Sequence, residues 1–146
     1  MARERTDILV SGGGLAGQIA TCALAAEGFD VTCVDPLPPV TDFDAPDSDL
    51  RSTAFLVPSI AVLERAGLWR MLAPFAQELR SMRLVDAGGP EGTVRETADF
   101  DPADIGAGRF GYNLPNWLLR REISRTLGQM PGARLVAPAG FATMVP

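Results

Sequence analysis

The chain has 146 residues, of which 47% are hydrophobic, and it carries a formal net charge of −5. This length and composition suit one domain with a buried core, and the acidic balance without a basic cluster argues against nucleic acid as a partner. The sequence contains no histidine, which is the commonest general base and metal ligand, so we expect no metal site.

The first predicted elements are a strand over residues 7–11, a helix over 15–27 and a strand over 30–35. The helix has an apolar face at helical spacing, and Gly28 ends it. Both strands are almost entirely apolar, as in central parallel strands that are buried on both faces. The pattern predicts a β–α–β unit at the N-terminus.

A glycine-rich turn joins the first strand to the helix. The run Gly12-Gly13-Gly14-Leu15-Ala16-Gly17 contains Gly-x-Gly-x-x-Gly, and Asp35 ends the second strand eighteen residues after Gly17. A carboxylate at that point can accept hydrogen bonds from an adenosine ribose. This order of strand, turn, helix, strand and acid is typical of a dinucleotide-binding unit.

Each position of the motif has a physical reason. Gly12 permits the tight turn, Gly14 lets the backbone approach a pyrophosphate, and Gly17 lets the helix pack closely. The free backbone N–H groups at the start of the helix, from Leu15 and Ala16 onward, lie at its positive end and are placed to meet the phosphates.

Residues 36–49 form a predicted surface loop, because they contain four prolines together with Asp42, Asp44, Asp47 and Asp49. One interpretation is a solvated loop, and the other is a mobile segment near a ligand.

Short helical and extended patterns alternate beyond this loop. The expected elements are a helix over 59–66, a helical turn over 68–72, a strand over 82–86 with a partner over 93–97, a loop over 100–108, a strand over 110–114, a helix over 117–127 and a returning strand over 134–137. In a plain nicotinamide dehydrogenase a second helix and a third parallel strand would come directly after the second strand, and here they do not. A dinucleotide-binding fold with so few sheet strands is incomplete. We therefore expect an α/β fold of which residues 1–146 are the N-terminal portion.

Neither the cysteines nor the N-terminus indicates export. Cys22 and Cys33 fit no zinc or redox spacing, so we expect buried, reduced thiols. The N-terminus is mixed in charge, unlike a signal peptide, and no apolar segment approaches membrane-spanning length. We expect a cytoplasmic protein.

Three segments carry a more specific signal than the glycine motif alone. The first is that motif with Asp35. The second is Asp49-Leu50-Arg51-Ser52-Thr53-Ala54, followed by Leu63-Glu64-Arg65-Ala66-Gly67-Leu68-Trp69, and the third is Phe110-Gly111-Tyr112-Asn113-Leu114-Pro115-Asn116, followed by Leu119-Arg120-Arg121. Together they resemble the flavin-dependent aromatic hydroxylases, the group typified by para-hydroxybenzoate hydroxylase, and most closely the ubiquinone-biosynthesis branch.

The resemblance implies a Rossmann-like FAD-binding domain of the GR2, or glutathione-reductase-like, type, with FAD bound and NAD(P)H as a transient reductant. It implies a monooxygenase that hydroxylates a phenolic or quinone-precursor ring with O2. Because substrates of the closest branch are prenylated, contact with the inner membrane is expected to be at most peripheral. The resemblance names no catalytic residue within this chain.

The resemblance also assigns two arginines to the cofactor. Arg51 matches the family arginine that reaches the flavin side, where its guanidinium could pair with the pyrophosphate. An ordinary surface arginine is the alternative. Arg120 and Asn116 lie where the family helix passes near the cofactor, and a solvated helix face explains Arg120 about equally well.

The chain also departs from the family. Pro115 and Trp117 stand where many members carry acidic or polar residues, and the later Asp-Gly and Gly-Asp pairs and the substrate-binding sheet are absent. We therefore expect this piece to be inactive by itself. The alternatives are another FAD oxidoreductase with the same glycine motif, or a non-catalytic dinucleotide-binding module.

Overall fold

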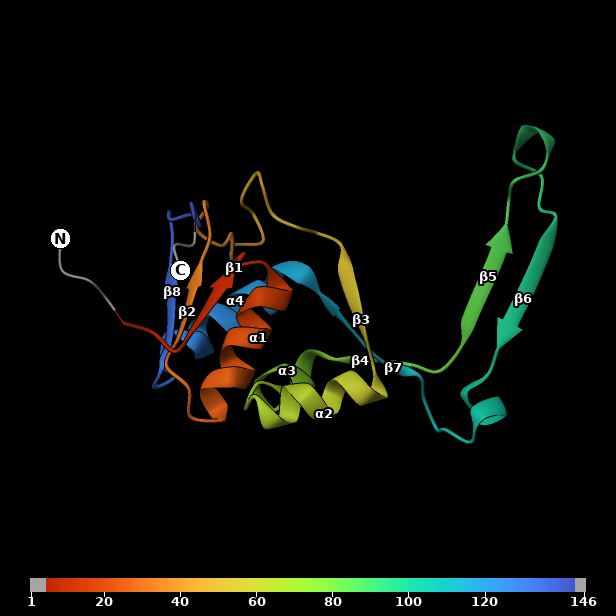
Figure 1. The fold of residues 1–146 in the computed structure, drawn as a ribbon. Helices are drawn as coiled ribbons and strands as arrows, with labels where there is room; N and C mark the ends of the chain where they lie inside the picture. Colours follow the sequence, from red (N-terminus) through yellow and green to blue (C-terminus); the bar gives the residue numbers. More distant parts are fainter. Residues whose placement is uncertain (1–4, 144–146) are drawn as a thin grey trace.

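The computed structural model describes residues 5–143, which form a body of helices and two small sheets with a separate two-stranded hairpin (Figure 1). A parallel sheet has the order β1-β2-β8, from β1 (Ile8–Ser11), β2 (Val31–Val34) and β8 (Ala133–Val136). Two helices, α1 (Leu15–Ala26) and α4 (Asn116–Leu127), pack on one face of this sheet. The predicted β–α–β unit and the returning strand are confirmed.

The prediction that both strands are buried on both faces is confirmed for β2 and is wrong for β1. β2 lies in the centre of the sheet, and its first three residues are buried. β1 lies at the edge of the sheet, and its Leu9 is 47% exposed. The reason is that, within residues 5–143, helices cover only one face of the sheet and no strand pairs with the outer edge of β1.

A second, antiparallel sheet has the order β3-β7-β4, from β3 (Ser52–Leu56), β7 (Gly111–Pro115) and β4 (Gln77–Leu79). The sequence predicted the central strand β7 to within a residue and missed both of its partners. Gly111 has a φ of +159° and a Cβ there would overlap the backbone of Phe55. Glycine at this position therefore permits β7 to lie this close to β3.

Two short helices connect these strands. The helix α2 (Val57–Arg65) starts two residues before the predicted 59–66, because Pro58 fits the first turn, where no N–H is needed. The helix α3 (Trp69–Leu72) corresponds to the predicted helical turn.

The core lies where the four α-helices and β7 meet. Its fully buried side chains come mainly from α2, α3 and α4, and include Leu63, Leu72, Leu114, Leu119 and Ile123. Cys22 joins this core from α1, and Cys22 and Cys33 are both free and buried, as predicted. Burial raises the pKa of the Cys22 thiol to about 11, and it also raises the pKa of Cys33.

The remaining strands, β5 (Met82–Asp86) and β6 (Glu96–Phe100), form a hairpin that extends away from the body (Figure 1). β5 has the predicted bounds. The predicted partner over 93–97 is displaced by three residues, because Asp86 pairs with Glu96 and a longer turn therefore intervenes. The predicted loop over 100–108 also contains a short 3-10 turn, Pro102–Ile105, capped by Asp101.

Candidate nucleotide-binding site

The glycine turn leaves β1 sharply and enters α1 directly. Gly12 has a φ of +109°, a conformation that side-chain-bearing residues rarely adopt, and its N–H donates to the Val34 carbonyl at 2.8 Å. Gly14 is the residue before the helix, and no side chain caps that end of α1. The first N–H groups of α1 therefore stay available to an external acceptor.

Gly14 and Gly17 play opposite steric roles. A Cβ on Gly17 would lie 3.0 Å from the Gly12 carbonyl carbon and closer still to its oxygen, so only glycine permits the turn to rest on the helix. A Cβ on Gly14 would meet nothing within 4 Å. The space over Gly14 is thus open to a ligand, whereas the space at Gly17 is filled by the protein itself.

Asp35 ties the turn to the end of β2. One carboxylate oxygen accepts the Gly13 N–H at 2.6 Å and the other accepts the Leu37 N–H at 2.8 Å. These backbone hydrogen bonds, first that of Leu37 and then that of Gly13, hold the pKa of Asp35 below its usual range, and the nearby charge of Arg120 contributes in the same direction. Asp35 is therefore a carboxylate with both oxygens partly engaged by backbone.

Gln18 holds the turn from beneath, a role that the sequence analysis missed. It is fully buried on α1, where its side-chain amide donates to the Gly13 carbonyl at 2.7 Å and accepts from the Ser124 hydroxyl at 2.8 Å. The signal was a long polar side chain among the mostly apolar residues of α1. Gln18 joins the turn to α4, so the two sides of the site are held together.

Replacing Gln18 with leucine is expected to lower the free energy of unfolding by about 1–3 kcal/mol, because the buried Gly13 carbonyl loses its partner. Chemical denaturation measures this loss. Ser124→Ala is the matched control, since it removes only the hydrogen bond to α4 and should cost less. An equal loss in both variants would contradict the role of Gln18 at the turn.

A hollow of about 390 Å³ lies beside the turn. Its walls come from the turn, the end of β2, the loop after it and α4, and its lining includes Gly13, Gly14, Asp35, Asp47, Asp49 and Arg120. Among the described residues, Arg120 is the one basic side chain in this lining. The loop over residues 36–49, with the predicted irregular backbone, forms one wall.

Arg120 carries an unsatisfied donor at this hollow. Its Nε is inaccessible to solvent and has no hydrogen-bond partner among the described residues. A buried guanidinium N–H without a partner is costly and is usually satisfied by a ligand or water. The charge of Arg120 also acts on Asp35 in the same lining, so an anion that enters the hollow would meet a positive charge there.

The structure does not bring Arg51 into this lining. Its guanidinium forms a two-point ion pair with Asp49, from Nε to Oδ1 at 2.8 Å and from the terminal nitrogen to Oδ2 at 2.9 Å. Asn116, the first residue of α4, donates to the same Oδ2 at 3.0 Å. Asp49, which the sequence analysis quoted without a role, is thus the link between Arg51 and the hollow.

The other predicted positions lie around the hollow rather than in its lining. Gly12 and Gly17 shape the turn, and Leu15 and Ala16 form the first turn of α1. Ala16 contributes to a different, apolar hollow between α1 and α2.

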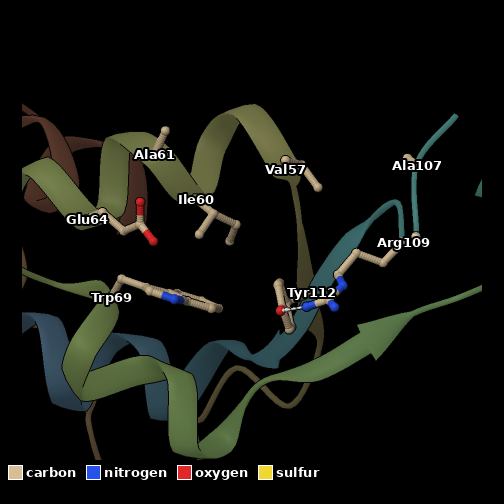
Figure 2. A pocket seen from close by; sticks show the side chains of 9 residues that line it. Val57, Ile60, Ala61, Glu64, Trp69, Ala107, Arg109 and Tyr112 are labelled. Atoms are coloured by element: carbon tan, nitrogen blue, oxygen red, sulfur yellow. Dashed lines mark hydrogen bonds between the residues drawn. The ribbon is translucent and has the colours of Figure 1, made fainter. Parts of the chain in front are cut away.

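A further hollow of about 520 Å³ lies between α2 and β7 and shares no lining residue with the first. Figure 2 shows Glu64 directed toward it from α2, with Trp69 and Tyr112 forming the opposite wall. Arg109 at its rim contacts the Tyr112 hydroxyl and forms an ion pair with Glu78 at 3.0 Å. This hollow has aromatic walls and no glycine turn, so it lacks the features of a phosphate site.

Residues 5–143 contain neither a candidate membrane span nor a candidate metal cluster. No helix there is long and apolar enough to cross a bilayer, and no group of three or more acidic or cysteine side chains could hold a metal ion.

Solved structures identify the class of fold. The chain superimposes on p-nitrophenol 4-monooxygenase PnpA from Pseudomonas putida with a TM-score of 0.62, at 20% identity, over 88% of this chain and 31% of that one. It also matches the flavin-dependent monooxygenase PieE, solved with FAD and substrate, with a TM-score of 0.62, at 19% identity, over 92% of this chain and 24% of that one. The mixed α/β fold is therefore one found in flavin-dependent monooxygenases.

Curated relatives narrow the resemblance. Ubiquinone hydroxylase UbiL of Rhodospirillum rubrum is 35% identical over 143 residues, which is 98% of this chain and 32% of the relative. The 3-demethoxyubiquinol 3-hydroxylase of Escherichia coli is 26% identical over 146 residues, 99% of this chain and 36% of the relative. No protein-family model matches the chain. The resemblance to ubiquinone-biosynthesis hydroxylases is confirmed, and the chain spans about a third of the length of the curated relatives it matches.

Proposed function

We propose that the hollow beside the glycine turn binds the ADP half of FAD. The observation that carries this proposal is the combination of open space over Gly14 with the Arg120 guanidinium in the lining of the same hollow. An anion in this hollow would meet the uncapped N–H groups of α1 and the positive charge of Arg120.

Each residue of the site has a distinct task in this proposal. Gly12 and Gly17 hold the turn against α1, and Gly14, Leu15 and Ala16 offer their backbone to the pyrophosphate. Asp35 still has free lone pairs for the ribose hydroxyls, because each of its oxygens accepts one backbone N–H.

Arg120 supplies the positive charge of the hollow and compensates Asp35. Its charge lowers the pKa of Asp35, and it would attract the pyrophosphate in the same way.

We further propose that the whole protein is a flavin-dependent monooxygenase that hydroxylates a phenolic or quinone-precursor ring. FAD would supply the oxygen-transfer chemistry, with NAD(P)H as reductant and O2 as the oxygen source. The names of the relatives, a ubiquinone hydroxylase and a demethoxyubiquinol hydroxylase, support this activity. We propose that any contact of the whole protein with a membrane is peripheral. The described residues contribute cofactor binding and no catalytic side chain.

We propose the finer architecture on the same grounds. The parallel order β1-β2-β8 with α1 behind the turn is compatible with a Rossmann-like domain of the glutathione-reductase (GR2) type. Residues 1–146 would be the N-terminal portion of this domain, and the remaining sheet strands, the later FAD motifs and the substrate domain would lie elsewhere in the protein.

The visible absorption spectrum of the protein expressed from its complete gene tests the function. We expect flavin bands, and release of FAD on denaturation, identified by mass. A colourless protein that takes up NAD and not FAD would overturn the proposal in favour of a nicotinamide-binding domain. Flavin without hydroxylation of any phenol or quinol under NAD(P)H and O2 would favour another class of flavin oxidoreductase.

A further inference from the structure

The proposed phosphate site has an unfavourable balance of charge. Three carboxylates, those of Asp35, Asp47 and Asp49, line the hollow, whereas Arg120 is the one basic residue lining it among those described. A pyrophosphate entering this hollow would be repelled by any carboxylate that lacks a compensating partner. The affinity of the hollow for a pyrophosphate therefore depends also on the residues that compensate the charges of these carboxylates.

Asp49 is the carboxylate with the most specific partner. Arg51 approaches it in fork geometry, and its side chain is 83% exposed whereas that of Asp49 is 14% exposed. The Nε–Nη2 edge of the guanidinium, one of the two edges that could bind a phosphate in two-point fashion, is thus already occupied by Asp49. The Arg51 hydrogen bonds and then that of Asn116 hold the pKa of Asp49 well below its usual range, so the group is a carboxylate at neutral pH.

A second set of bonds keeps Asp49 in place independently of Arg51. Its carbonyl accepts the Trp117 N–H at 3.1 Å, and its carboxylate accepts the Asn116 side-chain amide. Asn116 is itself held, because its side-chain oxygen accepts the Thr53 hydroxyl at 2.6 Å. If Arg51 were removed, the Asp49 charge would remain at the hollow without compensation.

We propose that Arg51 acts on the FAD site through Asp49, as a positioning residue that neutralises this carboxylate, and is not itself a ligand of the pyrophosphate. This inference rests on the proposed function. It differs from the role that the family resemblance implies, in which the arginine contacts the cofactor directly.

A double-variant cycle separates the two roles. FAD affinity is measured by flavin fluorescence for the protein expressed from its complete gene, in the wild type, Arg51→Ala, Asp49→Asn and the double variant. We expect Arg51→Ala to weaken binding about tenfold, because the Asp49 charge becomes uncompensated. Asp49→Asn alone should bind at least as well as the wild type, and the double variant should return to about the wild-type affinity.

A direct contact predicts a different pattern. The double variant would then bind as weakly as Arg51→Ala, and that result would overturn the inference, as would an Arg51→Ala variant that binds FAD like the wild type. Thermal unfolding of the cofactor-free variants checks that the fold survives, which the exposure of Arg51 leads us to expect.

The hairpin provides a matched control. Arg83 pairs with Asp99 in the same two-point geometry, at 2.6 Å and 2.9 Å, on an exposed surface outside the lining of the hollow. Arg83→Ala should leave FAD affinity unchanged. Failure of the wild type to bind FAD contradicts the proposed function itself, whereas binding by the wild type without rescue in the double variant contradicts this inference alone.

Discussion

Gly17→Ala is expected to destabilise the fold severely, by about 3 kcal/mol or more in the free energy of unfolding. The added Cβ would overlap the Gly12 carbonyl, which is backbone and cannot rotate away. Relief would require α1 to move off the turn, and α1 also packs on β2, β8 and α4. The clash therefore spreads into the core.

Thermal unfolding monitored by circular dichroism measures this effect. Gly140→Ala is the matched control, because a Cβ at Gly140 meets nothing within 4 Å and that residue lies outside the site. A Gly17→Ala variant that unfolds at the wild-type temperature would show that the Gly12 carbonyl does not lie against α1 at Gly17.

Gly14→Ala is expected to give the opposite result, with the fold retained and FAD bound more weakly. The Gly14 backbone is extended, with a φ of −66°, so alanine fits, and the change at the helix start costs at most about 1 kcal/mol. The methyl group would occupy the open space over the turn, where we propose that the pyrophosphate lies. Crowding of that kind costs about 1–3 kcal/mol, which weakens FAD binding about tenfold or more.

Fluorescence titration of the cofactor-free protein with FAD measures this loss. Unfolding temperature is recorded in parallel, so that a stability change is separated from a binding change. If Gly14→Ala binds FAD as tightly as the wild type, the pyrophosphate does not lie over Gly14. This conclusion holds whatever the effect of Gly17→Ala on stability.

Local sequence patterns predicted the parts of the fold that depend on local interactions. The strand, glycine turn and α1 follow from apolar periodicity and from backbone needs within about twenty residues, and α4 follows from its own amphipathic spacing. The edge strand β3 was missed because it pairs with β7, about sixty residues away in the chain. Burial of β1 was predicted wrongly because apolar residues cannot reveal whether a neighbouring strand is present.

The site follows the same division. The glycine motif and Asp35 are recognised by spacing, and the structure brings Asp35 and Arg120 to one hollow. The link from Arg51 to Asp49 and the support of the turn by Gln18 depend on side-chain geometry that no spacing rule contains. Asp49 and Gln18, whose roles were missed, bind other groups of the protein and do not belong to the glycine motif, so the motif did not indicate them.

The β5–β6 hairpin gives this chain two levels of local stability. A lone two-stranded hairpin is marginally stable in water, and here Met82, Leu84 and Phe100 are 42%, 55% and 42% exposed. Its ladder can therefore open without disturbing the helical core, so its amide protons exchange with solvent far sooner than those of β2 and α4. Any further strand that pairs with its edge, or any surface that covers Met82, Leu84 and Phe100, would slow this exchange, which makes the hairpin an internal reporter of whether the rest of the protein has assembled around it.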